Sequence, residues 1–298
     1  MTARDFGLLV VLSALWGASY LFLRVAAPVV GVFVLIAVRV LIAGGVLLLY
    51  AALVGHRPRL RQRWGSLLAL SAVNAVLPFT LIAAATVYLN ASIASILNAT
   101  TPLFTALVAA LWMKETLGYK KLIGLVLGLL GVAVLMGWSP LGLSAGVLWG
   151  ILFSLAGALC YGIGGVYAKT SFRDLPTLDL AIGQQLAAGV LLLPLAAATA
   201  EVKPLSMTVI ASVLALALLS TAFAYLIYFD LIARVGPTNT LSVTFLIPVF
   251  GTLWGASFLH EPLRVSMLLG LAIILTGVFL VTGVKLRGAR LAAASAGR

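Results

Sequence analysis

The chain has 298 residues, of which 63% are hydrophobic and only 9% are charged, and its mean hydropathy is +1.21. Soluble domains of this length carry far more charge, so the composition excludes an ordinary soluble protein and indicates a polytopic membrane protein. The formal net charge of +12 would suggest a nucleic-acid partner in a soluble chain, and the positions of the charges decide between the two interpretations.

Ten apolar runs follow one another along the chain, each close to the roughly 20 residues that a helix needs to cross a bilayer. The runs lack a period of two, and lipid offers no partner to unpaired backbone groups, so helices are expected rather than a barrel. The predicted spans are 6–25, 31–54, 65–86, 90–113, 119–137, 145–167, 178–198, 206–229, 235–259 and 265–284. We expect the first run to remain as a span, because its removal as a signal peptide would leave nine spans and would break the charge pattern of the loops.

Basic residues are concentrated in alternate loops between these spans. If the N-terminus is cytoplasmic, little besides Arg24, Lys203 and Arg264 falls outside. The inside loops and the inside C-terminal tail then carry Arg57, Arg59, Arg61, Arg63, Lys114, Lys120, Lys121, Lys169, Arg173, Arg234, Lys285, Arg287, Arg290 and Arg298. This positive-inside pattern predicts that both termini are cytoplasmic, and it explains the basicity without a nucleic-acid partner.

The stretch from Asn98 to Gly131 is repeated in outline from Thr244 to Gly277. Four residue pairs mark the match at one offset of 146 positions: Pro102 and Pro248, Glu115 and Glu261, Gly124 and Gly270, and Gly131 and Gly277. Five spans per copy is an odd number, so the second copy must cross the membrane in the opposite sense, as in many transporters. We predict repeats at 1–141 and 142–288, followed by a basic tail at 289–298.

Three predicted spans carry a proline with a polar residue four positions before it. The pairs are Asn74 with Pro78, Asn98 with Pro102, and Thr244 with Pro248. Proline leaves the carbonyl of the earlier residue without its helical partner, so polar groups at mid-depth need protein, water or substrate as partners. Ser220 matches Asn74, although Ala224 replaces the proline. Such groups either hold helices together or line a site, and their recurrence in both repeats favours the site.

Aromatic residues inside the spans are candidates for a cavity wall. They are Trp16, Tyr20, Phe79, Tyr161, Tyr225 and Tyr228. Trp16 matches Tyr161 across the repeat, and Phe79 matches Tyr225, which favours a shared wall over simple packing. Tryptophans near span ends, such as Trp64 and Trp112, are typical of interfacial anchors instead.

Arg39 is the one cation predicted inside a span. An intramembrane charge is a functional candidate, but Arg39 is near enough to the outer surface for its side chain to snorkel, and Glu261 could pair with it. Glu115 and Glu261 have a structural interpretation as well. Each precedes a predicted helix, whose N-terminus favours a carboxylate.

The sequence lacks the patterns of several other chemistries. Its seven carboxylates fall at or near span ends, so no buried acid is expected to relay protons. His56, His260 and Cys160 make no metal-ligand cluster, and no phosphate-binding loop is found. We therefore predict no catalytic residue, no metal site and no cofactor, which argues against a membrane enzyme.

Ten helices in two inverted sets of five, with the proline, glutamate and glycine spacing repeated, resemble the drug/metabolite transporter superfamily, specifically its EamA-type members. Within it, the chain is similar to the YddG-type exporters of amino acids and metabolites in bacterial inner membranes. The resemblance implies a monomer that works by alternating access, with helices around a central cavity and the fifth and tenth spans at the periphery. It does not fix the residues that contact substrate.

The leading hypothesis is export of small metabolites, aromatic and other hydrophobic amino acids first, down the substrate's own gradient or by exchange. The predicted substrate site consists of Trp16, Tyr20, Asn74, Phe79, Asn98, Tyr161, Ser220, Tyr225 and Thr244, with helix breaks for gating at Pro78, Pro102 and Pro248. Its amides and hydroxyls would hold amino and carboxyl groups, and its rings would hold the side chain. The alternatives are multidrug efflux, flipping of a lipid-linked metabolite, and a structural or receptor role without flux.

Overall fold

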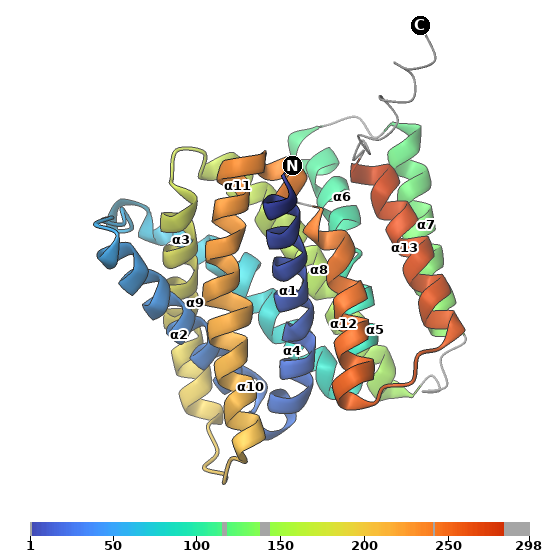
Figure 1. Ribbon diagram of the computed structural model, residues 1–298, viewed down its shortest axis with the longest axis horizontal. Helices are drawn as coiled ribbons and strands as arrows, with labels where there is room; N and C mark the ends of the chain where they lie inside the picture. The colour runs from blue at the N-terminus through green and yellow to red at the C-terminus, as the bar shows by residue number, and fades with distance from the viewer. Residues whose placement is uncertain (1, 115–117, 138–143, 241, 283–298) are drawn as a thin grey trace, which may run out of the picture.

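The computed structural model describes residues 2–114, 118–137, 144–240 and 242–282, which form a bundle of helices with no strand among them (Figure 1). The all-helical prediction is confirmed. The α-helices are α1 (Ala3–Val30), α2 (Val32–Leu53), α3 (Trp64–Ser71), α4 (Leu77–Tyr88), α5 (Ala91–Asn98), α6 (Thr101–Met113), α7 (Tyr119–Gly137), α8 (Ala145–Ser171), α9 (Thr177–Thr199), α10 (Met207–Ala217), α11 (Ala224–Thr240), α12 (Val243–Leu259) and α13 (Val265–Thr282). A short 3₁₀ turn, η1 (Arg61–Arg63), precedes α3.

Eight helical segments of the described residues are long and apolar enough to cross a membrane. The apolar helix α12 is shorter, at 17 residues, and α7 has 19 residues and packs along α13. Large apolar side chains such as Leu53, Leu111 and Leu129 are exposed, as expected for surfaces that face lipid. The chain is therefore a multi-pass membrane protein.

The third and eighth predicted spans each contain a π-helical segment, η2 (Ala72–Val76) between α3 and α4 and η3 (Leu218–Phe223) between α10 and α11. The two segments begin 146 positions apart, the offset of the sequence repeat. Pro78 follows η2, but the matching Ala224 follows η3, so proline does not explain the wider turns. In η3, the Thr221 hydroxyl donates to the carbonyl of Leu216 (2.7 Å), five residues earlier. Such turns are frequent at functional sites.

The fourth and ninth predicted spans differ in where they break. The fourth is two helices, because α5 ends at Asn98 and Pro102 stands in the first turn of α6. The ninth starts later than predicted, at Val243, and Gly236 (φ 78°) interrupts the helical backbone before it. Pro248 lies inside α12, which runs on past it as one helix. A helix break at Pro102 is therefore present, whereas at Pro248 the helix is continuous.

Helix packing joins elements from the two halves of the sequence. α2 packs on α9, α1 on α12, and α8 on α4 and α6. α7 and α13 lie side by side at one edge of the bundle (Figure 1). Their position agrees with the peripheral place expected for the fifth and tenth spans.

α1 and α8 run in opposite directions. Arg24, near the end of α1, donates hydrogen bonds to the carbonyls of Thr86 and Val87 at the end of α4 (2.6 and 2.9 Å). Leu89, just beyond α4, fits against Gly150 near the start of α8. The end of α1 and the start of α8 therefore lie at the same end of the bundle.

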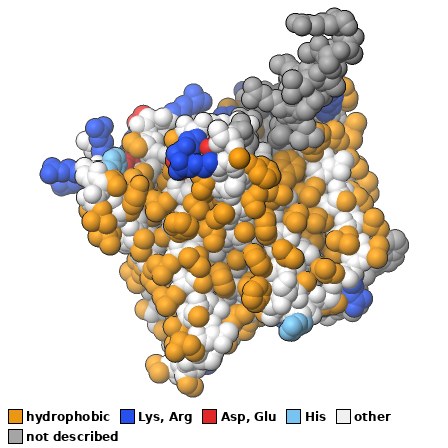
Figure 2. Space-filling model, in the orientation of Figure 1, with side chains coloured by type: hydrophobic (Ala, Val, Ile, Leu, Met, Phe, Trp, Pro, Cys, Tyr) orange, Lys and Arg blue, Asp and Glu red, His pale blue; other side chains and the backbone are white. Residues whose placement is uncertain are grey.

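Charged side chains gather at the ends of the bundle and leave a broad apolar band between them (Figure 2). At the end where the chain begins, Arg63 pairs with Asp174 (2.7 Å) and His56 contacts Asp179. Most of the described Lys and Arg residues lie in loops or near the ends of helices at this end of the bundle (Figure 1). This distribution is the one that the positive-inside pattern predicts for two ends of different charge.

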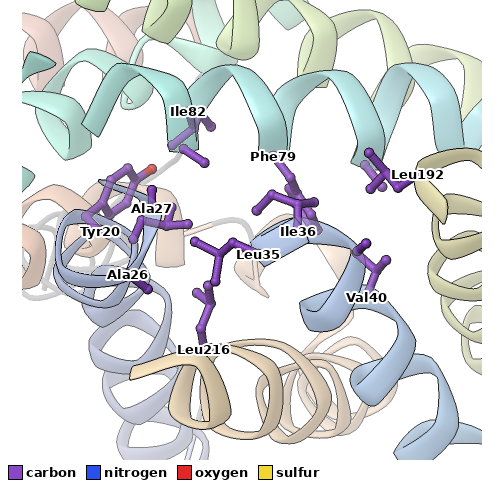
Figure 3. Close-up of a cluster of buried hydrophobic side chains, with 14 of the residues drawn as sticks. Tyr20, Ala26, Ala27, Leu35, Ile36, Val40, Phe79, Ile82, Leu192 and Leu216 are labelled. Carbon is purple, nitrogen blue, oxygen red and sulfur yellow. The ribbon is translucent and has the colours of Figure 1, made fainter. Parts of the chain in front are cut away.

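An apolar cluster fixes the first helices against one another. Tyr20 of α1, Ile36 and Val40 of α2 and Phe79 of α4 are buried in it together (Figure 3). Ile36 and Val40 are four residues apart, so they share one face of α2. That face is held toward the interior of the bundle.

Candidate functional site

Arg39 projects from α2 into the interior of the bundle. It lies three residues after Ile36 and so shares the buried face of the helix. Only 6% of Arg39 is exposed. Its Nε donates to the Thr221 hydroxyl of η3 (2.9 Å), and its guanidinium carbon lies 3.9 Å from the centre of the Phe79 ring on α4. The expectation that Arg39 could snorkel to the outer surface is therefore wrong.

Glu261 is not the partner of Arg39. Its carboxylate accepts hydrogen bonds from the amides of Ala91 and Ser92 (2.7 and 2.9 Å) and from the Ser92 hydroxyl (2.5 Å) at the N-terminus of α5. The predicted kind of contact, a carboxylate at a helix N-terminus, is correct. The predicted helix is wrong, because the carboxylate caps α5 rather than α13, which follows it in the chain. Glu115, the matching residue, lies outside the described residues.

The two π-helical segments present polar side chains to the paired helices α2 and α9. Thr221 of η3 accepts the hydrogen bond from Arg39 of α2, and the Asn74 amide of η2 donates to Oε1 of Gln184 on α9 (2.9 Å). Asn74 also lies against Gly164 of α8, where a side chain would collide with it. Each widened turn therefore carries a polar residue to a helix of the other half.

Four of the predicted aromatic residues form two edge-to-face pairs. The ring centres of Trp16 on α1 and Tyr225 on α11 are 6.4 Å apart, and those of Phe79 on α4 and Tyr161 on α8 are 6.2 Å apart. Edge-to-face contact is a favoured geometry for aromatic rings. Tyr228 extends the first pair, at 5.4 Å from Trp16. The residues that match across the repeat thus occupy matching contacts.

Three tyrosine hydroxyls lie within electrostatic range of Arg39, namely those of Tyr20, Tyr161 and Tyr225. The Tyr20 hydroxyl also interacts with Asn98 at the end of α5, and that of Tyr225 with Gln184. Helices α1, α2, α4, α8 and α11 and segment η3 therefore contribute to one group of side chains. We call it the Arg39 cluster and define it as Tyr20, Arg39, Phe79, Tyr161, Thr221 and Tyr225.

Other predicted site residues make contacts within the protein. Ser220 is fully buried, and its hydroxyl donates to the Leu15 carbonyl of α1 (2.7 Å), which holds η3 against α1. The backbone carbonyl of Asn98 accepts from the Thr101 hydroxyl (2.7 Å). Thr244 is half-buried in the first turn of α12. Contact of these residues with a substrate stays a prediction.

No described carboxylate is paired with Arg39. The sequence has seven carboxylates, and all except Glu115 are described. Their partners are Thr2 for Asp5, Arg63 for Asp174, His56 and the Arg59 amide for Asp179, Lys203 for Glu201, Arg234 for Asp230, and the start of α5 for Glu261. Among the described residues, Arg39 is a buried cation without a counter-ion.

Two polar residues of α9 were missed by the sequence reasoning. Gln184 receives the hydrogen bond from Asn74. Gln185 is fully buried, and neither atom of its side-chain amide has a hydrogen-bond partner among the residues that the structure describes. Gln185 stands 146 positions after Arg39, so the offset of the repeat could have paired the two residues. Thr221 was also missed, although it directly follows the predicted Ser220.

A surface hollow of about 480 Å³ lies elsewhere, lined by Leu48, Ala52 and residues 55–58 around the end of α2. It contains none of the predicted site residues. The chemistry of the Arg39 cluster, rather than this hollow, therefore defines the candidate site.

Comparison with protein families decides the class of this molecule. The model of the EamA-like transporter family matches the chain twice, over residues 6–137 and 148–283. The chain belongs to the EamA-like transporter family. The resemblance drawn from the repeated proline, glutamate and glycine positions is thereby confirmed at the level of the family.

Relatives of this EamA family member are named as transporters. YvbV of Bacillus subtilis, an uncharacterized transporter, is 29% identical over 277 residues, which are 92% of this chain and 90% of YvbV. YedA of Escherichia coli K12, an uncharacterized inner membrane transporter, is 31% identical over 287 residues, 93% of this chain and 90% of YedA. A probable amino-acid metabolite efflux pump of the same bacterium is 29% identical over 210 residues, 67% of this chain and 70% of the pump.

A solved crystal structure shares the fold of this EamA family member. The two chains match with a TM-score of 0.68 at 21% sequence identity, and the match covers 100% of both.

Proposed function

We propose that this EamA family member is an alternating-access exporter of small metabolites, aromatic and other hydrophobic amino acids first. The observation that carries the proposal is the Arg39 cluster, in which aromatic rings, tyrosine hydroxyls and a cation from five helices meet inside a membrane protein. Rings accept apolar side chains of varied shape, and the polar groups suit the charged end of an amino acid. Ionisable groups inside a membrane protein commonly mark a substrate pathway.

We propose further that ten spans form two inverted five-helix repeats, at 1–141 and 142–288. The opposite directions of α1 and α8 support this arrangement, as do the π-helical segments at the repeat offset. The paired packing of α2 with α9 and of α7 with α13 supports it too, because each pair joins helices that correspond in the two repeats. In transporters of this architecture, substrate binds between the repeats.

The membrane orientation is part of the same proposal. The basic end of the bundle, where α1 begins, is placed in the cytoplasm of a bacterial cell, with the protein in the inner membrane. The positive-inside rule and the concentration of Lys and Arg at that end support this choice. The relative named as a probable amino-acid metabolite efflux pump supports export as the direction and amino acids as cargo.

Flux through purified protein in liposomes tests the proposal. Liposomes preloaded with phenylalanine should accumulate labelled phenylalanine or tryptophan by exchange, and protein-free liposomes should not. Flux of cationic drugs in the absence of amino-acid flux would replace the proposal with multidrug efflux. Uptake that strictly requires an imposed proton gradient would contradict movement by exchange.

A further inference from the structure

We infer that Arg39 binds the carboxylate of the cargo, so that this transporter selects molecules with a carboxylate group and rejects amines of the same shape that lack one. The inference deepens the proposed function and rests on it. It starts from the unpaired charge of Arg39 and from the side chains that surround it.

Among the described residues, the charge of Arg39 has no counter-ion on any helix packed around it. The Thr221 hydroxyl and the Phe79 ring contact Arg39, and the Tyr20, Tyr161 and Tyr225 hydroxyls lie within electrostatic range of it; all of these groups are uncharged. All six described carboxylates have partners elsewhere. A buried charge without a partner is strongly unfavourable in the interior of a protein, more so within a membrane. A residue kept under these conditions is typical of a binding role.

The contacts that Arg39 does make leave its binding edge free. The Phe79 ring stabilises the cation through its face, and Thr221 accepts from Nε alone. Among the described residues, neither Nη atom makes a hydrogen bond. A guanidinium binds a carboxylate through two parallel N–H donors, and the two Nη atoms supply such donors.

The surroundings of Arg39 also set the rest of the cargo. Phe79 and Tyr161 form one aromatic pair beside the guanidinium, and Tyr225 joins the second pair with Trp16. An aryl or alkyl group attached to the bound carboxylate would therefore meet rings. The cargo class is amphipathic carboxylates, including zwitterionic amino acids, whereas an amine with the same hydrocarbon group and no carboxylate brings only a positive charge next to Arg39.

Two probes with the same hydrocarbon group separate these classes. 3-Phenylpropionate and phenethylamine share one phenethyl group and differ in carrying a carboxylate or an amine. Phenylalanine and its carboxamide provide a second pair, and these two molecules have the same shape. Binding is measured by the thermal unfolding of purified wild-type protein in detergent at increasing ligand concentration. We expect stabilisation by the two carboxylates and none by the amine or the carboxamide. A wild type that no carboxylate stabilises, or that the amine stabilises equally, would overturn the inference.

Variants of two arginines locate the effect. Arg39→Gln should weaken carboxylate binding at least tenfold, and Arg39→Lys, which keeps the charge but loses the fork of donors, should fall between it and the wild type. Arg24→Gln is the matched control, because Arg24 makes only backbone contacts at the end of α4. It should bind carboxylates like the wild type. Unchanged binding by Arg39→Gln would refute the assignment.

A purely structural role for Arg39 makes a different prediction. Without ligand, Arg39→Gln should unfold at the same temperature as the wild type or a higher one, since an uncompensated charge has been removed. If the role of Arg39 were structural, its replacement by glutamine would lower the unfolding temperature. The binding assay also separates this inference from the proposed function. Carboxylate binding that depends on Arg39, in the absence of any flux, would contradict only the transport proposal. Amino-acid flux that Arg39→Gln leaves intact would contradict only the inference.

Discussion

A side-chain carbon added to Gly17 of α1 would lie only 2.8 Å from the backbone nitrogen of Gly251 on α12. Real side-chain carbons do not approach backbone so closely, so the two helices touch through their backbones at this point. A side-chain carbon added to Gly162 of α8 would likewise lie only 2.9 Å from the backbone nitrogen of Thr105 on α6. Small residues at both crossings therefore set how closely the helices around the Arg39 cluster pack.

The Gly17 crossing predicts a large effect of a single methyl group. Gly17→Ala should lower the free energy of unfolding by about 1–3 kcal/mol, because the backbone of α12 has to move. Gly7→Ala on the same helix is the control, since nothing lies within 4 Å of the added carbon. It should be neutral or stabilise by up to about 1 kcal/mol through helix propensity. Thermal unfolding in detergent measures both, and equal midpoints would contradict the contact.

The capping of α5 by Glu261 predicts a second effect on stability. Glu261→Gln keeps the size of the side chain but removes the charge at the helix N-terminus, and should cost about 1–2 kcal/mol. The comparison is Glu201→Gln. In the wild type, Glu201 lies in an exposed loop and pairs with Lys203, which lowers the pKa of the Glu201 carboxyl. Loss of this exposed pair should change unfolding little. A Glu261 variant as stable as the Glu201 variant would show that the cap contributes nothing.

The contact between Trp16 and Tyr225 predicts an effect on transport. Trp16→Ala removes one ring of an aromatic pair beside the Arg39 cluster and should reduce amino-acid exchange in liposomes at least fivefold, about 1 kcal/mol of binding. Trp149 of α8 is 52% exposed on the surface of the helix bundle and serves as the control. Its replacement by alanine should leave exchange unchanged. Equal losses in both variants would point to folding rather than to the site.

The unsatisfied amide of Gln185 predicts a gain in stability. Gln185→Leu replaces a buried amide, which has no hydrogen-bond partner in the described part of the chain, with an apolar side chain of similar volume. The change should raise the unfolding free energy by about 1–3 kcal/mol. Asn74→Leu is the comparison, because the Asn74 amide does have a partner in Gln184. That variant should be destabilised. A destabilised Gln185→Leu variant would mean that the Gln185 amide is satisfied in solution.

Much of the architecture could be predicted from the sequence, because long apolar runs and repeated proline, glutamate and glycine positions are local signals. The family followed from residues such as Pro102 and Pro248 at one offset. The π-helical turn at Thr221 was not predicted, since its hydrogen bond to the carbonyl of Leu216 needs no proline and leaves no motif. The repeat could have indicated this turn, because η3 begins at the sequence position that matches the start of η2.

The environment of Arg39 shows what sequence spacing cannot supply. Counting residues from the end of α2 gives the height of Arg39 along its helix but not the direction of its side chain. That direction depends on Ile36 and Val40, which pack the same face against the bundle. Likewise, the sequence placed Glu261 next to α13, and only the packing of the two halves brings it to Ser92.

An unpaired positive charge inside the bundle would make the proposed alternating-access cycle sensitive to voltage. If that cycle connects Arg39 first with one side of the bilayer and then with the other, the empty protein moves part of an elementary charge through the field. A full crossing is worth about 2.3 kcal/mol per 100 mV. With a negative cell interior, the empty form would be drawn toward the state open to the cytoplasm. A cargo of net charge −1 would cancel this pull, whereas a zwitterionic amino acid would leave it unchanged. The resting potential would then return the emptied carrier to the compartment where it reloads.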